Sequence, residues 1–201
     1  KFSFKVRDHI EAENTYAEVV MKPTKSLQKE LYAEIKKRMK ENDMSVPVKD
    51  GPYLYYSRTK KGKQYAIHCR RKGEKGKEEV ILDENELAKG QKYFTLDAAE
   101  ISPDHNLLAY TTDTNGSEKF RLRIKDLQTG KLLSEDIDSM GSIVWAEDGK
   151  HLLYTLEEHP YHPRKVLIHE LGTPSSSDKL VYEEKDPQWY VGVGKTSSKK
   201  F

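Results

Sequence analysis

Apolar residues recur at every fourth position in the segment 26–41, and most residues between them are charged or polar. They are Leu27, Leu31, Ile35 and Met39. Residues three or four apart share one face of an α-helix, so the pattern predicts an amphipathic helix. A similar spacing begins near residue 9 and ends before Pro23, which predicts a preceding helix. The apolar face of the second helix must be buried against another surface, because such helices gain most of their stability from packing.

From about Val46 onward, short runs rich in tyrosine and aliphatic residues alternate with polar turns. Each turn contains an Asp together with residues such as Gly, Pro, Asn or Lys. The turns occupy residues 49–52, 102–106 and 147–150. Strands separated by turns every 8–12 residues or so are typical of an all-β sandwich, barrel or propeller.

A sequence repeat favours the propeller among these folds. Residues 101–130 match residues 145–174 at a constant offset of 44. The identical pairs are Asp104/Asp148, Leu108/Leu152, Tyr110/Tyr154, Thr111/Thr155, Ile124/Ile168, Leu127/Leu171 and Thr129/Thr173. An earlier copy aligns Asp50 and the run 53–56 with Asp104 and the run 107–110 at an offset of 54. A unit of about 40–45 residues with four strands is the period of a propeller blade.

The repeat also predicts individual strands. The first unit has strands at 64–70 and 78–82, and the later units have third strands at 131–136 and 179–183. A fourth unit begins at Val191, and Phe201 opens its next strand. Propellers close with roughly four to eight blades, and residues 46–201 hold about three and a half. The sequence therefore predicts a mainly β fold, a partial propeller preceded by a helical segment.

Composition removes several classes of protein. Hydrophobic residues are 35% of the 201 and charged residues 34%, yet twelve Tyr, five Phe and two Trp exclude a disordered chain. No apolar run of about 18 residues exists, which excludes a membrane-spanning helix. The first ten residues lack a secretory signal, and the single cysteine, Cys69, favours a reducing, cytoplasmic location. A net charge of +2 indicates no particular partner.

Sequence motifs for catalysis, phosphate binding or metal binding are absent or weak. The sequence has no Gly-x-Ser-x-Gly and no glycine-rich phosphate loop, and the stretch 192–196 is interpreted as a strand and turn. His159 and His162 flank a proline, which favours a loop with solvated histidines over a metal site. Cys69 is expected to be packed rather than reactive. We assign no catalytic, cofactor-binding or metal-ligating residue, and no cofactor.

Residues 58–77 contain nine basic residues and one acidic residue, Glu74. A nucleic-acid patch is one interpretation. Acidic residues follow directly in 78–86, so we favour a solvated hairpin whose lysines protect a strand edge. The sequon-like stretch 115–117 is interpreted as a turn.

Several segments resemble the oligopeptidase B group of the prolyl oligopeptidase family of serine peptidases. The stretch 9–16 is similar to the Y-L-E-A-E-N-x-Y motif near the start of that group. Four further segments match in the same order, namely 50–58, 101–104, 181–187 and 190–196. The resemblance covers essentially residues 8–201.

This resemblance implies that residues 1–45 form a helical segment that packs on a C-terminal α/β-hydrolase domain. Residues 46–201 would be the first blades of a seven-bladed propeller that gates the active site against folded proteins. Members of the group cleave short peptides after Lys or Arg with a serine nucleophile in the hydrolase domain, so the present residues alone are expected to be inactive. The implied partners are that domain and short basic peptides, with no nucleic acid and no membrane. The alternative is a free-standing β-repeat binding module that closes by oligomerising.

Overall fold

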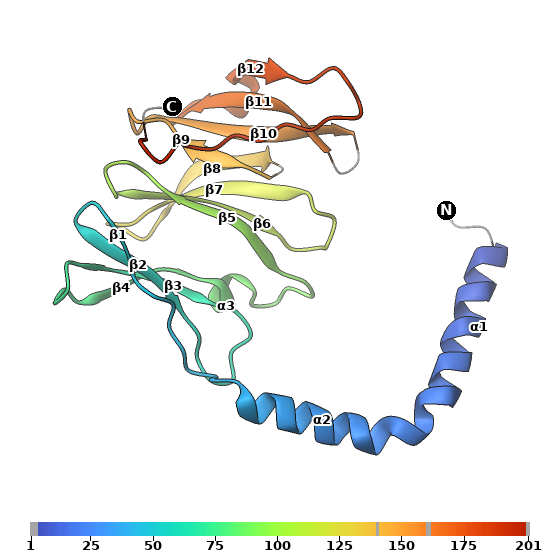
Figure 1. The fold of residues 1–201 in the computed structure, drawn as a ribbon. Helices are drawn as coiled ribbons and strands as arrows, with labels where there is room; N and C mark the ends of the chain where they lie inside the picture. The colour runs from blue at the N-terminus through green and yellow to red at the C-terminus, as the bar shows by residue number, and fades with distance from the viewer. Residues whose placement is uncertain (1–3, 140, 160–161, 200–201) are drawn as a thin grey trace. The chain divides into compact units, whose positions relative to one another are not determined.

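A computed structural model describes residues 4–139, 141–159 and 162–199, with side chains for all of these except 157–159. The chain divides into two compact units, Lys1–Asp43 and Met44–Phe201. The first unit is helical, and the second consists almost wholly of antiparallel strands (Figure 1). The expected mainly β fold with a helical N-terminal segment is confirmed.

The first unit contains α1 (Phe4–Met21), a 3₁₀ turn (Lys22–Thr24) and α2 (Lys25–Arg38). Both expected helices form, but α1 begins at Phe4 rather than near residue 9. Pro23 lies in the 3₁₀ turn between them, where its missing N–H leaves no helical hydrogen bond unmade. The predicted end near residue 41 was wrong, because Met39 is already extended at φ −82° and ψ 131°.

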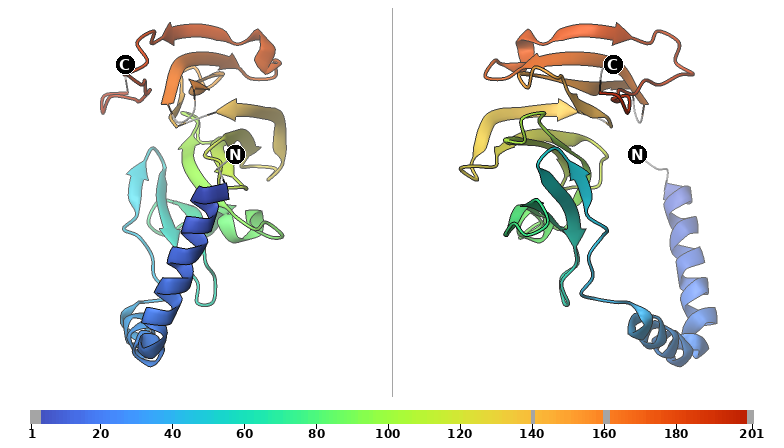
Figure 2. Two further views of the ribbon diagram at one scale, coloured as in Figure 1. Left: turned by 90° about the vertical axis from the view of Figure 1, so that its right-hand side faces the viewer. Right: turned by 60° about the vertical axis from the view of Figure 1, so that its left-hand side comes forward.

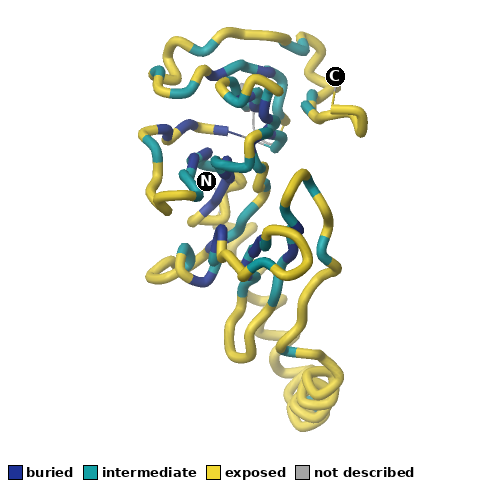
Figure 3. The backbone as a smooth tube through the Cα atoms, turned by 90° about the vertical axis from the view of Figure 1, so that its left-hand side faces the viewer, coloured by how far each residue is buried: buried dark blue, intermediate teal, exposed yellow. Residues whose placement is uncertain are grey.

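The apolar stripe of α2 is exposed. Leu27, Leu31 and Ile35 each keep about half of their surface, and no residue of α1 or α2 within the described part is buried. Every residue of the two helices is exposed, and the coil of α2 accordingly carries no buried stretch in Figure 3. A contiguous apolar surface of this kind is typical of an interaction site.

We expect the 201-residue chain to self-associate in solution, because water contact with the α2 stripe is unfavourable. Replacing Leu31 and Ile35 together by Gln should lower the weight-average mass measured by light scattering. The matched control replaces Lys29 and Lys36, on the opposite face of α2, by Gln and should leave the mass unchanged. A monodisperse, monomeric wild-type chain at high concentration would contradict this prediction.

The second unit contains three four-stranded sheets, each with its strands in chain order. The first sheet comprises β1 (Val48–Asp50), β2 (Tyr53–Arg58), β3 (Ile67–Lys72) and β4 (Glu78–Asp83), followed by the short helix α3 (Glu84–Leu87). The second comprises β5 (Thr95–Ile101), β6 (Leu107–Asp113), β7 (Phe120–Asp126) and β8 (Leu132–Ser139). The third comprises β9 (Ile143–Trp145), β10 (His151–His159), β11 (His162–Glu170) and β12 (Lys179–Glu183), with a 3₁₀ turn (Ser175–Ser177) before β12. The sheets follow one another through the unit (Figure 2).

The repeat in the sequence is a repeat of hydrogen bonds in the structure. The Thr111 hydroxyl accepts a hydrogen bond from the Ala98 N–H at 3.0 Å. At the same offset of 44, the Thr155 hydroxyl accepts one from the Ser142 N–H at 3.1 Å. The aromatic and aliphatic pairs of the repeat are also buried in both sheets, namely Leu108 with Leu152 and Tyr110 with Tyr154. Each predicted unit is therefore one four-stranded sheet.

Some strand limits differ from those predicted. The strand expected at 64–70 begins at Ile67, because the Tyr65 N–H is bound by the Asn85 side chain at 3.0 Å instead of by a neighbouring strand. The strand expected at 131–136 continues to Ser139, and the one expected at 179–183 is confirmed.

The strand predicted from Val191 was wrong for the described residues 191–196, which form no regular element. The Val191 N–H donates to the Pro163 carbonyl at 2.9 Å, but a single bond of this kind is not the continuous ladder that a strand requires. The expectation for Phe201 lies outside the described residues.

The core lies between the sheets. One cluster joins the second sheet to the third, and its members are Ala109, Leu122, Ile124, Ile137, Ile143, Trp145, Leu152 and Tyr154. A second cluster joins the first sheet to the second through Leu82, Leu108 and Tyr110. Buried residues accordingly gather in the strands (Figure 3). The sheets are thus held face to face, and their first strands are left at one edge.

Candidate functional site

The first strands of the three sheets, β1, β5 and β9, form what we call the inner edge. Each is the terminal strand of its sheet. The Trp145 indole N–H donates to the Glu100 carbonyl at 2.9 Å, which ties β9 to β5. A hollow of about 370 Å³ at this place is lined by β5, β9 and residues 193–195. The segment that follows the third sheet therefore returns to the inner edge.

Acidic side chains lie along the inner edge. Partial burial raises the pKa of Asp97 and of Glu100, and the nearby Lys195 ammonium opposes the shift at Glu100. Lys195 forms an ion pair with Glu147, and the Lys199 ammonium lies 2.6 Å from an Asp50 carboxylate oxygen. The carboxylates of this edge are thus in part neutralised by lysines of the returning segment.

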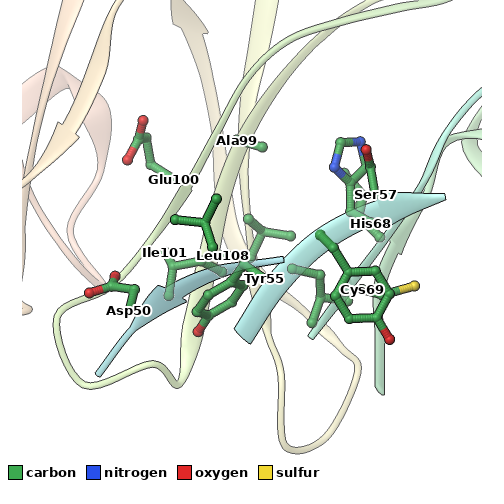
Figure 4. A pocket seen from close by; sticks show the side chains of 13 residues that line it. Asp50, Tyr55, Ser57, His68, Cys69, Ala99, Glu100, Ile101 and Leu108 are labelled. Carbon is green, nitrogen blue, oxygen red and sulfur yellow. The ribbon is translucent and has the colours of Figure 1, made fainter. Parts of the chain in front are cut away.

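A larger cavity of about 420 Å³ lies between the first and second sheets (Figure 4). It is lined by side chains of β2 and β3 on one side and of β5 and β6 on the other, including Tyr55, His68, Glu100 and Leu108. The His68 Nε2 lies 2.8 Å from a Glu84 carboxylate oxygen at the start of α3. Most of its lining is apolar, and Leu82 and Leu108 also belong to the cluster between the first and second sheets, so the cavity borders that part of the core.

Cys69 also borders this cavity, and it is fully buried. Burial raises the pKa of its thiol, which disfavours the reactive thiolate. The expectation that Cys69 is a packed residue is confirmed.

The structure corrects the interpretation of two histidines. His159 and His162 are backbone partners at the ends of β10 and β11, not residues of a loop, and bulges near 156–159 accommodate the irregular pairing. The His162 ring stacks on Tyr190 with ring centroids 6.2 Å apart. Within the described ranges, no group of three His, Cys, Asp or Glu side chains could hold a metal ion.

The basic stretch 58–77 runs from the end of β2 through β3 and its flanking turns, and several of its cations are bound to carboxylates. Arg58 pairs with Glu78 at 3.0 Å and Arg70 with Glu79 at 2.8 Å. Arg70 is not solvated as expected, because it also lies 4.2 Å from the Tyr53 ring centroid and donates to the His105 carbonyl. This arginine connects the first and second sheets, so it serves structure rather than binding of nucleic acid.

A buried polar cluster escaped the sequence analysis. His169 has no exposed surface, and its Nδ1 lies 2.7 Å from Asp178 Oδ1. Its Nε2 lies 4.0 Å from Glu135 Oε1 on β8 of the second sheet. The Tyr154 hydroxyl donates to the second Asp178 oxygen at 2.9 Å, and burial and this bond raise the pKa of Tyr154. The offset of 44 aligns His169 with Lys125, the one signal in the sequence that could have marked the position.

Comparison with known proteins identifies the arrangement of sheets. The family model described as prolyl oligopeptidase, N-terminal beta-propeller domain, matches residues 3–201. This chain belongs to the prolyl oligopeptidase family. Its sheets are therefore propeller blades, and the described residues contain three of them without a closed ring.

Relatives in this family are peptidases by name. The chain is 38% identical to dipeptidyl aminopeptidase BI of Pseudoxanthomonas mexicana over 96% of its own length and 29% of the relative. It is 34% identical to protease 2 of Moraxella lacunata over 98% of its own length and 30% of that protein. It superposes on oligopeptidase B from Trypanosoma brucei, in a closed form with covalently bound antipain, with a TM-score of 0.87 and 30% identity, covering 99% of this chain and 28% of the other. The chain thus spans less than a third of the length of these relatives.

No helix within the described part of this prolyl oligopeptidase family chain is both long and apolar enough to cross a membrane.

Proposed function

We propose that this chain is the gating propeller portion of a serine oligopeptidase that hydrolyses short peptides after Lys or Arg. The Ser, His and Asp residues of such a reaction would belong to an α/β-hydrolase domain that is not among these 201 residues. That domain would cleave the peptide by acyl transfer to the serine. Support comes from the family and from relatives whose names denote peptidases, among them oligopeptidase B with bound antipain.

The observation that carries the proposal is the inner edge. Blades of a propeller surround a central channel, and the terminal strands are neighbours in pairs, since β1 and β5 line one cavity and β5 and β9 line another. Asp97 and Glu100 bring carboxylates to this edge. A channel entrance of negative charge raises the local concentration of cationic peptides. A gate of this composition would suit a peptidase for basic substrates.

The helical segment has a separate part in the proposal. We divide the chain into residues 1–45, which would pack on the hydrolase domain, and residues 46–201, which supply the propeller blades. The exposed stripe of Leu27, Leu31 and Ile35 supports this division, because such a surface requires a partner. A reducing, cytoplasmic location remains part of the proposal and rests on the single cysteine.

The test uses the natural protein that contains this sequence and fluorogenic peptides that differ only in the residue before the scissile bond. We expect kcat/KM for Arg and Lys peptides to exceed that for the Ala peptide by about 100-fold or more. A peptide of about ten residues should be cleaved, while the same peptide inserted in a folded protein should not.

Equal rates for Arg and Ala peptides would refute the preference for basic residues. Cleavage of the folded substrate at the rate of the free peptide would refute the gate. Replacing Asp97 by Asn and Glu100 by Gln should lower kcat/KM for Arg peptides by about threefold to tenfold at low salt and much less at high salt. The matched variant Glu18→Gln on α1 should change nothing.

A further inference from the structure

The cavity of about 420 Å³ between the first and second sheets has the size of a small binding pocket. Pockets that hold small ligands commonly measure roughly 300–1,000 Å³ and are mostly apolar, with a few polar groups that fix the ligand's orientation. Both sheets contribute to the apolar part of this lining, through Ile81 and Leu82 of the first and Ile101 and Leu108 of the second. A ligand in this cavity therefore buries an apolar portion against two sheets.

Carboxylates lie at one end of the cavity (Figure 4). Asp50 ends β1 and Glu100 lies on β5, so each sheet contributes one of them. Within the described part of the chain, the Glu100 carboxylate makes no hydrogen bond or ion pair, and only the Lys195 ammonium acts on it electrostatically. Two carboxylates on opposite walls attract one cation jointly, so this end of the cavity favours a positively charged group.

The opposite end of the cavity carries a hydroxyl and an imidazole. Ser57 and His68 are partners in the ladder of β2 and β3, which places their side chains next to each other on one face of the sheet (Figure 4). A Glu84 carboxylate oxygen lies 2.8 Å from the His68 Nε2 and so fixes the ring. A hydroxyl both donates and accepts hydrogen bonds, so this end suits the N–H and C=O groups of a peptide.

The chain's own lysines show that the acidic end accepts ammonium groups. The Lys199 ammonium lies 2.6 Å from an Asp50 carboxylate oxygen, and this hydrogen bond raises the pKa of Lys199. Lys199 is not part of the lining, so it reaches the carboxylate from outside the cavity. Both members of the pair are about half exposed, and exposed ion pairs contribute little to stability. A ligand that adds apolar contacts to the same charge can therefore displace Lys199.

We propose that this cavity binds one Lys or Arg residue of a peptide, with the cation of that residue held by Asp50 and Glu100. The methylene stem lies against the apolar lining, and the amide groups of the peptide bond to Ser57 and His68. The three parts of such a residue follow in the same order as the three parts of the cavity. The proposal rests on the proposed function for the nature of the peptide, and it adds a binding site to a gate that attracts cations. The competing occupant of the acidic end is Lys199.

The test uses the natural protein that contains this sequence and the acetylated amide of photo-lysine, which carries a diazirine on its side-chain stem. Mass spectrometry should map the photolabel to residues 48–57 or 99–108, and labelling should saturate with probe concentration. Acetyl-lysine amide should compete with the probe, whereas acetyl-norleucine amide, which lacks the cation, should not. Labelling only outside these segments, or equal competition by the two amides, would overturn the proposal.

Two carboxylates on one strand distinguish a pocket from general attraction. Glu100→Gln alters the lining, and we expect labelling at a limiting probe concentration to fall about tenfold. Asp97→Asn is the matched control and should leave labelling unchanged, because Asp97 lies on the same strand but not in the lining. The measurement is made at about 0.15 M salt, where attraction beyond about 8 Å is screened. Equal losses in the two variants would show attraction without a pocket and contradict the proposal.

Filling the cavity tests its apolar part. Ala99→Phe, at an exposed position of the lining, keeps both carboxylates and should abolish labelling while the circular dichroism spectrum stays unchanged. Undiminished labelling of a folded Ala99→Phe protein would refute the pocket. Labelling that appears only in Lys199→Met would mean that Lys199 holds the site, which would also refute it.

None of these measurements requires cleavage of a peptide. A protein that is labelled at this cavity but cleaves no peptide would refute the proposed function alone. A protein that cleaves Arg and Lys peptides but is not labelled at this cavity would refute the pocket alone.

Discussion

Trp145→Ala should destabilise the chain by about 3–5 kcal/mol, the usual cost of removing a buried large aromatic side chain. Trp145 is 1% exposed and lies in the cluster that joins the second and third sheets. Its indole N–H also donates to the Glu100 carbonyl. The variant therefore leaves a cavity and also removes one hydrogen bond to that carbonyl. Thermal unfolding followed by circular dichroism should show a fall in Tm on the order of 10 °C.

Trp189→Ala is the matched control for this measurement. Trp189 is 64% exposed, so its removal should change stability by no more than about 0.5 kcal/mol. Trp145→Phe separates the two contributions, because it keeps most of the packing and loses the indole donor. If the Tm values of Trp145→Ala and Trp189→Ala fell equally, the boundary between the second and third blades would not hold the unit together.

His169→Ala should cost about 3–5 kcal/mol for a different reason. The imidazole contacts the buried Asp178 carboxylate at 2.7 Å and lies 4.0 Å from that of Glu135. Removing the imidazole leaves the buried Asp178 carboxylate without this hydrogen-bond partner and opens a cavity, and a buried polar group left unpaired is strongly destabilising. The loss should be measurable as a lower midpoint in urea with an unchanged m value.

His151→Ala provides the control, since it removes an equally short but exposed His–Asp contact in the same sheet. His151 Nδ1 lies 2.6 Å from Asp148, whose pKa is lowered to about 2 by hydrogen bonds from the Lys150 N–H and from His151. Exposed pairs contribute about 0–1 kcal/mol, so this variant should stay close to wild type. A His169→Ala protein as stable as His151→Ala would mean that water reaches Asp178 and Glu135.

Elements with a local cause could be predicted from the sequence. The stripe of α2 and the position of Pro23 predicted two helices, because helical spacing and a missing N–H act within a few residues. The strand at 179–183 was predicted for the same kind of reason. Limits that depend on a distant partner were missed. The start of β3 is one case, since it is set by the Asn85 side chain twenty residues beyond Tyr65.

The candidate site was predicted less well than the fold. Cys69 was expected to be packed and is buried, but the inner edge was not foreseen. At that edge β5, β9 and residues 193–195 lie together. Local sequence patterns do not predict this contact, because it joins strands of separate sheets. Arg70 was expected in solvent for the same reason, because its partners lie on β4 and in the turn at His105.

The sequence by itself determined the repeat, the number of strands in each unit and the turns between them, because offsets of 44 and 54 preserve side-chain alternation and turn residues. Only the tertiary structure decided what each repeated position does. Lys125 and His169 are equivalent in the ladders, yet Lys125 donates to the Ile81 carbonyl of the preceding sheet whereas His169 lies beside the Glu135 carboxylate of its preceding sheet. Contacts between blades depend on how whole sheets stack, and stacking is decided by all the side chains of two faces at once.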